Sequence, residues 1–258
     1  MTKLSLLAYN TRTGFGDDVT CKKLIDLIKS FNPDIAFFSD ALPQRISKDK
    51  LAYIKNSLSD LGYDILVSDT ERTDRTDWTR SMGISKQALN AKHFYGGLRN
   101  ETYNVELGGK IITGRHFDDR NESNRLQGID DLEKVDVVMG DFNAMYRNTL
   151  IAHTLHILMP IGNSFKDINT DVSIVKNPLL RAVSLFQRFT RMSDGKMLNE
   201  LKSFGFVETN KNQIPTMHRI AQLDHILVKP RITFLNFKVH KNVGLSDHKP
   251  ISVDIKFS

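Results

Sequence analysis

Acidic, amide and imidazole side chains stand at the ends of short apolar runs in five separate parts of the sequence. They are Asn10 after residues 4–9, Asp40 after residues 35–38, Asp141 and Asn143 after residues 137–139, Asp224 before residues 226–228, and Asp247 with His248 before residues 251–255. Short apolar runs of this kind predict buried strands, and polar groups at several strand ends gather at one rim of a sheet. The pattern predicts a catalytic rim.

Each of these motifs also has a purely structural explanation. Asp141 and Asn143 are typical of a turn in which side chains bond the backbone, and Ser246-Asp247-His248 is typical of a cap. His116, which follows residues 111–113, could be an ordinary hydrogen-bonded histidine. The coincidence of all these motifs at strand ends favours catalysis over separate structural roles.

Strand-like and helix-like segments alternate along the chain and must position these residues. Strands are expected at residues 4–10, 35–38, 63–67, 108–113, 135–139, 222–228 and 251–255. Helices are expected at residues 18–30, 48–61, 124–134, 148–158, 178–192 and 195–204. Interleaved strands and helices predict an α/β fold, and the absence of a linker-like stretch predicts one domain over residues 1–258.

Composition and charge narrow the class of protein. The 258 residues carry 40% hydrophobic side chains and one cysteine, Cys21, which excludes a disordered chain and an internal disulfide. No signal peptide or membrane-spanning run is seen, so a cytoplasmic location is expected. Residues 1–150 carry 21 basic and 22 acidic side chains, but residues 151–258 carry 15 and 8, which indicates an anionic partner.

Six motifs, in order, resemble those of the endonuclease/exonuclease/phosphatase superfamily. They are Tyr9-Asn10, Pro33-Asp34-Ile35 with Ser39-Asp40, His116 to Arg120 with Arg125 and Gln127, Gly140 to Ala144, Leu223-Asp224-His225, and Ser246 to Pro250. The resemblance spans residues 4–255. It implies a four-layer α/β/β/α sandwich, in which two packed mixed sheets are flanked by helices and their edge forms a metal-dependent phosphoesterase site.

The resemblance also implies roles for individual residues. Asn10 and Asp40 would hold a divalent cation, with Asp247 as a further ligand. Oxygen ligands of this kind suit Mg²⁺, with Mn²⁺ as an alternative. His248 would pair with Asp224 as an acid–base dyad. Asp141 and Asn143 would orient the attacking water or the leaving oxygen, and His116 would donate to a non-bridging phosphate oxygen.

One motif departs from the superfamily pattern. Ser39-Asp40 stands where the superfamily usually has Gln-Glu, so the carboxylate expected to bind metal is one methylene shorter. Three explanations follow: the backbone approaches the ion more closely, a water bridges the gap, or the metal binds more weakly.

The leading functional hypothesis is a divalent-metal-dependent phosphodiesterase that hydrolyses nucleic acid, DNA before RNA, by attack of an activated water. Alternatives are hydrolysis of a phospholipid headgroup or phosphoinositide, and a phosphate-binding module without turnover. Residues 68–79, with Trp78, Arg72 and Arg75, are the candidate substrate-contact loop. Residues 172–191 form a basic amphipathic segment that would either bind an anionic surface or pack on the sheet.

Overall fold

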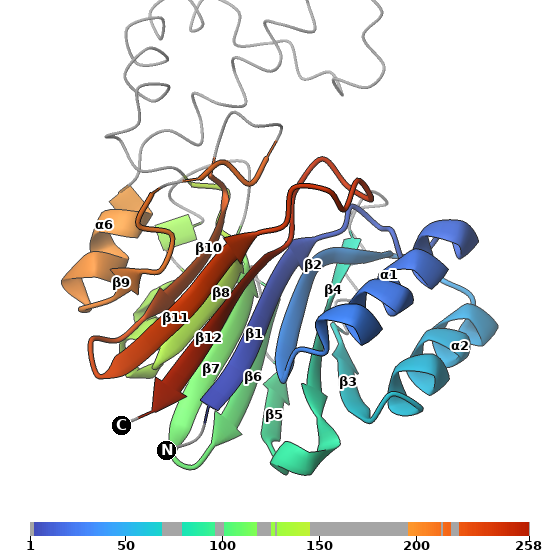
Figure 1. The fold of residues 1–258 in the computed structure, drawn as a ribbon, viewed down its shortest axis with the longest axis horizontal. Coiled ribbons are helices and arrows are strands. Elements are labelled where there is room, and N and C mark those ends of the chain that lie inside the picture. Colours follow the sequence, from blue (N-terminus) through green and yellow to red (C-terminus); the bar gives the residue numbers. More distant parts are fainter. Residues whose placement is uncertain are drawn as a thin grey trace, which may run out of the picture.

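The computed structural model describes residues 3–68, 79–95, 101–117, 125–126, 128–144, 196–212, 214–217 and 222–257. These residues form two six-stranded mixed sheets that pack face to face (Figure 1).

Sheet 1 has the strand order β11-β12-β1-β2-β4-β3. Its strands are β1 (Lys3–Asn10), β2 (Ile35–Pro43), β3 (Tyr63–Val67), β4 (Thr79–Lys86), β11 (Ile232–Val239) and β12 (Ile251–Phe257). β1 and β2 run parallel and every other neighbouring pair is antiparallel. The carboxyl ends of β1 and β2 therefore lie at one edge of the sheet.

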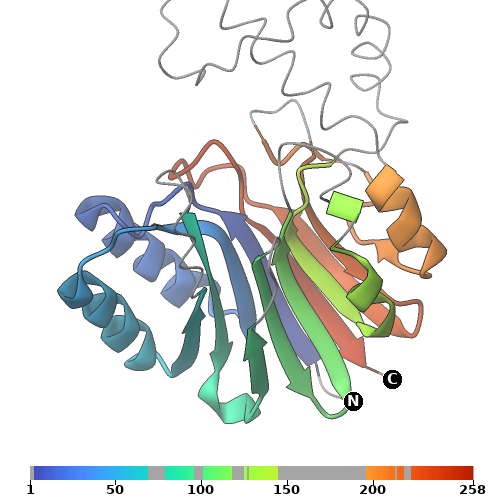
Figure 2. The ribbon, with the colours of Figure 1, turned by 180° about the vertical axis from the view of Figure 1, so that it is seen from behind.

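Sheet 2 has the order β5-β6-β7-β8-β10-β9 and is seen in Figure 2. Its strands are β5 (Lys92–Tyr95), β6 (Glu101–Leu107), β7 (Lys110–His116), β8 (Val137–Asp141), β9 (Val207–Glu208) and β10 (Asp224–Val228). Here β7 and β8 form the parallel pair. Each sheet thus contains one parallel pair whose polar strand ends reach an edge together.

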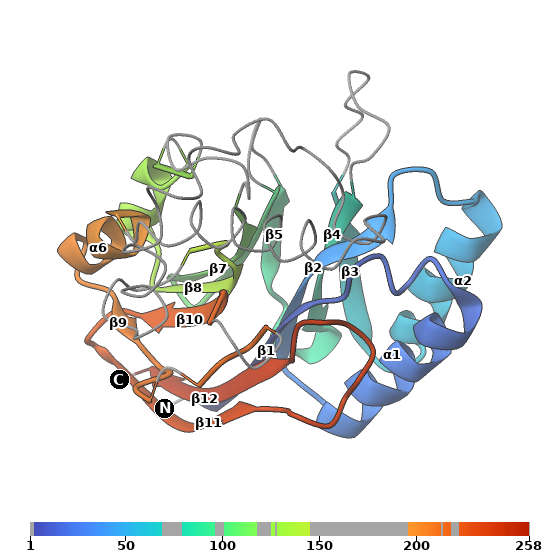
Figure 3. The same cartoon turned by 90° about the horizontal axis from the view of Figure 1, so that it is seen from above.

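Helices cover the outer faces and complete four layers. α1 (Asp18–Phe31) and α2 (Lys48–Ser59) pack on sheet 1, and α6 (Lys196–Ser203) with the 3-10 helix η2 (Asp130–Lys134) packs on sheet 2 (Figure 3). A second 3-10 helix, η1 (Gln87–Leu89), follows β4. The Asp17 side chain caps α1 by accepting from Thr20 N at 2.8 Å, and left-handed Asn32 ends it.

The core between the sheets consists of alternating inward side chains from both. Leu6, Phe37 and Val253 of sheet 1 meet Val105 and Met139 of sheet 2, all fully or almost fully buried. A close approach occurs at Gly83, where an added Cβ would lie 2.1 Å from the Tyr103 ring. β4 therefore requires glycine at this position to let the two sheets meet.

The predicted four-layer sandwich is confirmed. The strand predictions at residues 108–113 and 135–139 were displaced, because the strands extend to include His116 and Asp141. β4, β5, β6, β9 and β11 were not predicted. Of the described part of residues 124–134, residues 125–126 are α-helical and Asp130–Lys134 form the 3-10 helix η2. The expected helices at 148–158 and 178–192, and most of the loop 68–79, lie outside the described residues. One domain over residues 1–258 stays a prediction.

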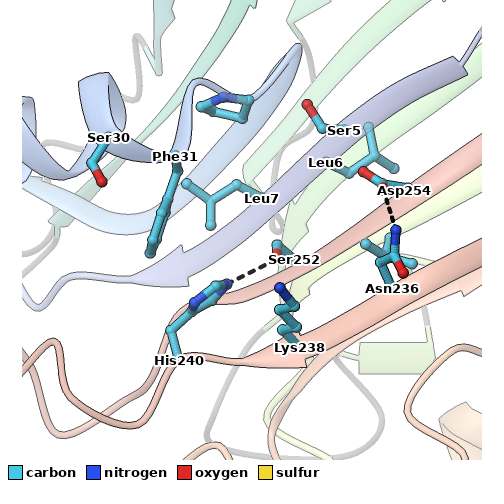
Figure 4. Close-up of a pocket in the computed structure, with 12 residues that line it drawn as sticks. Ser5, Leu6, Leu7, Ser30, Phe31, Asn236, Lys238, His240, Ser252 and Asp254 are labelled. Carbon is cyan, nitrogen blue, oxygen red and sulfur yellow. Dashed lines mark hydrogen bonds between the residues drawn. The ribbon is translucent and has the colours of Figure 1, made fainter.

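A groove of about 410 Å³ lies on the outer face of sheet 1 beside the end of α1 (Figure 4). Its walls include the Phe31 ring, which stacks on His240 at 4.3 Å between ring centres, and Lys238. His240 Nε2 lies 2.8 Å from Ser252 Oγ. This groove is separate from the strand ends that carry the predicted site residues. In the described part of the chain, no helix is both long and apolar enough to span a membrane.

Candidate active site

Side chains from both sheets meet at the edge where the two parallel strand pairs end. Asn10 ends β1, Asp40 lies on β2 at the same edge, and His116 and Asp141 end β7 and β8. In Figure 1 this is the upper edge of the sheets, and Figure 3 looks down on it. Strand direction therefore brings four of the eight predicted site residues to one edge, and a bulge in β2 completes the placement of Asp40.

Asn10 joins the two sheets by bonding one carboxylate in each. Its Nδ2 donates to Asp40 Oδ2 at 2.9 Å and to Asp141 Oδ2 at 2.8 Å. The backbone N–H of Arg12 donates to Asn10 Oδ1 at 3.1 Å, which fixes the orientation of the amide. Because Asn10 is buried, it holds Asp40 and Asp141 at a fixed separation.

Asp40 reaches this position through an irregularity in β2. The pairing of β2 with β4 shifts register between Phe38 and Leu42, and Asp40 has φ 46°. A bulge redirects a side chain, and aspartate tolerates the left-handed region better than most residues. The bulge therefore turns the shorter Asp40 side chain toward Asn10.

The surroundings of Asp40 favour its ionised form. The hydroxyl of Thr79 donates to Asp40 Oδ1, and His116 Nδ1 lies 3.5 Å from the same oxygen. Burial alone would raise the pKa of Asp40, but the charge of His116 and the hydrogen bonds from Thr79 and Asn10 outweigh burial and hold the pKa below its usual value. Asp40 is therefore a carboxylate at neutral pH.

Asp224 and His248 form the predicted dyad. Asp224 opens β10 and pairs in register with Asp141, and its Oδ2 lies 2.8 Å from His248 Nδ1. Both side chains are buried. Burial would lower the pKa of His248, but the carboxylates of Asp224 and Asp141 outweigh burial and raise it to about 9. Without a bound cation, His248 is an imidazolium at neutral pH.

Asp141 Oδ2 lies opposite both histidines. It is 3.9 Å from His248 Nε2 and 4.0 Å from His116 Nε2. These distances are too long for direct hydrogen bonds and match a space that one water or phosphate oxygen can bridge. Burial raises the pKa of Asp141, and Asp224 adds to this effect while His248 and His116 oppose it. A carboxylate of raised pKa facing two imidazoles can take part in proton transfer.

The turn after β8 holds Asn143 beneath His116. Asn143 has φ 49°, and its backbone N–H donates to Asp141 Oδ1 at 2.9 Å. Its Nδ2 donates to Phe117 O at 2.9 Å and lies 3.4 Å from His116 Nε2. Gly140 is required before this turn, because it has φ 138° and an added Cβ would lie 2.1 Å from Arg115 O.

No family model and no curated protein matches the chain in sequence. Among solved structures, an endonuclease/exonuclease/phosphatase from Beutenbergia cavernae matches with a TM-score of 0.63 at 13% identity, covering 100% of this chain and 72% of that one. The chain has the endonuclease/exonuclease/phosphatase fold. The AP endonuclease LMAP from Leishmania major has the same fold, with a TM-score of 0.65, 11% identity, and 99% and 88% coverage.

The endonuclease/exonuclease/phosphatase fold also occurs in a different kind of protein. A Cimex nitrophorin, solved as a ferrous NO complex, matches with a TM-score of 0.54 at 13% identity, covering 99% of this chain and 98% of that one. Because one fold occurs in such different proteins, function must be argued from the side chains at its edge.

Those side chains fit a divalent cation. Ligand atoms of Asp141, Asp224 and His248 all lie within 4.8 Å of one another, and this buried group could hold a metal ion. Asp224 Oδ1 is buried without a hydrogen-bond partner in the described structure. With Asp40, three carboxylates share this edge, and a divalent cation would offset their charge. The predominance of carboxylate oxygens suits Mg²⁺ or Mn²⁺, while the imidazole also allows softer metals.

Asp247, the other predicted ligand, makes a contact that sequence reasoning missed. Its Oδ1 lies 3.0 Å from Arg12 Nε and accepts from Ser246 Oγ at 3.3 Å. The Arg12 side chain is 48% exposed, with its backbone at φ 46°. The only sequence signal for Arg12 was its position two residues after Asn10. Asp118, Asp119 and Gln127 of the motifs lie outside the described residues.

Proposed function

We propose that this protein is a divalent-metal-dependent phosphodiesterase that hydrolyses nucleic acid. The observation that carries the proposal is the position of Asp141 Oδ2, 3.9 Å from His248 Nε2 and 4.0 Å from His116 Nε2. One carboxylate oxygen thus lies at a distance from two imidazole nitrogens that a single water or phosphate oxygen can bridge. Phosphoryl transfer needs mainly such positioning and charge stabilisation.

Asp40 is the carboxylate that we assign to the cation, because it is ionised, partly exposed and aligned by Asn10. Asp141, Asp224 and His248 could also hold an ion, but we assign them to proton transfer because His248 is paired with Asp224 and faces Asp141. Asn10 and Asp247 as further ligands stay predictions. When bound, a divalent cation would neutralise carboxylate charge and polarise the substrate phosphate.

The remaining residues have complementary roles in hydrolysis. Asp141 Oδ2 orients the attacking water and accepts its proton as the new P–O bond forms. His248, held by Asp224, donates a proton to the leaving oxygen as the old P–O bond breaks. His116 donates to a non-bridging oxygen, and Asn143 supports its ring. The result is one phosphomonoester end and one hydroxyl end.

Two observations support nucleic acid as the substrate. Residues 151–258 carry 15 basic and 8 acidic side chains, which favours a polyanion. One protein of the same fold is an AP endonuclease. DNA before RNA stays a prediction.

A substrate panel tests the proposal. The protein would be incubated with plasmid, single-stranded DNA, abasic-site DNA and RNA, with Mg²⁺, with Mn²⁺ and with EDTA. We expect cleavage of at least one nucleic acid that EDTA abolishes and that His248→Ala lacks. Release of phosphate or phosphocholine from liposomes instead would identify a lipid headgroup phosphoesterase. No metal-dependent turnover in any arm would leave the phosphate-binding module as the better reading.

A further inference from the structure

A buried polar cluster beneath the site connects the two strand ends that carry Asp141 and Asp224. Its centre is His225, fully buried on β10 directly after Asp224. His225 Nδ1 lies 2.5 Å from Glu208 Oε2, and Gln222 Nε2 donates to the same oxygen at 3.2 Å. Glu208 belongs to β9, the edge strand of sheet 2, so the cluster ties this edge to the site.

Both ring nitrogens of His225 face oxygen acceptors. Nδ1 faces Glu208, and Nε2 lies 3.1 Å from the carbonyl oxygen of Ala144. The other oxygen of Glu208 accepts from Asn210 N at 2.9 Å, so the carboxylate is itself fixed. Glu208 therefore fixes the orientation of the His225 ring, so that Nε2 points at the carbonyl oxygen of Ala144. Hydrogen-bonded carboxylates orient histidine rings in the same way around many metal sites.

Ala144 immediately follows Asn143 in the turn after β8. The His225 ring also packs against Phe142, with 5.1 Å between ring centres, and Phe142 packs on Phe117 at 5.0 Å. The turn is thus held by a hydrogen bond at Ala144 and by ring contacts at Phe142. Asp141 and Asn143 alternate with these anchored residues and project into the site.

We infer that Glu208 and His225 are positioning residues that hold the turn of residues 141–144, and thereby set the placement of Asp141 and Asn143 opposite the two site histidines. The inference rests on the proposed function for its catalytic consequence. Glu208 and His225 touch no reacting atom, and their effect is transmitted through Ala144 and Phe142. A misplacement of about 1 Å at a reacting group is enough to cost about 100-fold in rate.

The activity test compares Glu208→Ala, Glu208→Gln and His225→Phe on the substrate found by the panel. Glu208→Gln keeps an oxygen acceptor for Nδ1, whereas Glu208→Ala removes it. We expect kcat to fall by about 10- to 100-fold in Glu208→Ala and His225→Phe, with KM changed less than about threefold, and to recover largely in Glu208→Gln. His240→Phe is the matched control, because His240 directly follows β11 of sheet 1 and its ring stacks on Phe31 of α1.

Hydrogen exchange provides a readout independent of turnover. The N–H of Phe142 donates to Leu223 O, and that of Asn143 donates to Asp141 Oδ1. Both should exchange at least about tenfold faster in Glu208→Ala than in Glu208→Gln or His240→Phe, measured well below the unfolding temperature. Unchanged exchange at both amides would overturn the inference, as would unchanged kcat in an active protein. An inactive parent protein with the expected exchange pattern would overturn only the proposed function.

Discussion

Asn10 Nδ2 lies 2.8 Å from Asp141 Oδ2, so a side chain that ends β1 in one sheet fixes a carboxylate that ends β8 in the other. The same nitrogen bonds Asp40 at 2.9 Å. The geometry of the site therefore depends on how the two sheets pack against each other. Because Asn10 bonds one carboxylate in each sheet, it fixes the distance between Asp40 and Asp141.

Replacing Asn10 should separate these acids. Asn10→Ala removes both hydrogen bonds and leaves the like charges of Asp40 and Asp141 to repel each other, so we expect kcat to fall at least about 100-fold. Steady-state kinetics on the cleaved substrate measures this. Asn236→Ala, which removes an exposed asparagine that bonds Asp254 at 2.8 Å, should leave kcat unchanged. A fall of less than threefold in Asn10→Ala would contradict the linking role.

The acid–base dyad makes a separate prediction. His248→Ala should lower kcat by about 1,000-fold or more, because it removes the proton donor and a positive charge beside Asp141. Asp224→Asn keeps an acceptor for Nδ1 but removes the charge, and should lower kcat by a smaller factor. Circular dichroism should show native folding in both. Retention of activity in His248→Ala would show that another residue donates the proton.

These predictions start from residues that the sequence identified. The sequence could identify them because their signal is a local pattern of neighbouring residues. Asn10 and Asp141 end uninterrupted apolar runs, and such a run followed by a polar residue is readable without knowing the fold. β4 was missed because Gly83 and its serines lack an apolar pattern, although the strand is mostly buried. Its need for glycine comes from Tyr103 in the other sheet, a contact that no local pattern records.

The contacts of Arg12 and of Glu208 were missed for a similar reason. Each depends on which strands become neighbours: Arg12 meets Asp247, and Glu208 meets His225 through the pairing of β9 with β10. Residue type and spacing predicted the candidate catalytic groups. Long-range pairing decides which groups hold them in place.

The departure at Asp40 can be tested by lengthening its side chain. The bulge in β2 already brings Asp40 to Asn10 and Thr79, so Asp40→Glu should crowd the site and lower kcat by about tenfold. Asp40→Asn should raise the Mg²⁺ concentration needed for half-maximal activity at least about tenfold, more than Asp141→Asn does. Appearance of activity in Asp40→Glu where the parent protein has none would instead favour the phosphate-binding module.

The ion pair of Arg12 and Asp247 separates two roles for Asp247. If its carboxylate mainly orients Arg12 toward substrate phosphate, Asp247→Asn and Arg12→Ala should each raise KM, and the double variant should be little worse than either. The Mg²⁺ requirement should stay within about threefold of the parent. A tenfold rise in that requirement for Asp247→Asn alone would identify Asp247 as a metal ligand, as the superfamily resemblance implies.

His93 should make the stability of the protein sensitive to mild acid. It bridges the sheets, because Ser85 Oγ of β4 lies 2.9 Å from its Nε2 and the Tyr103 hydroxyl lies 2.9 Å from its Nδ1. A neutral imidazole donates from one nitrogen and accepts at the other, which suits two hydroxyl partners. Burial lowers the pKa of His93, although Asp64 opposes this shift.

Because the pKa of His93 is lower in the folded state than in the unfolded state, the unfolded state binds a proton at a higher pH than the folded state does as the pH falls. The contribution of His93 to the free energy of unfolding is therefore complete above a pH of about 6.5 and is lost as the pH falls from there through the folded-state pKa. Urea unfolding of native protein and His93→Gln between about pH 7.5 and pH 5 measures it. Native protein should lose more stability over this interval than the variant does. If the free energy of unfolding changed with pH equally in both proteins, His93 would not contribute to the pH dependence of stability in this range.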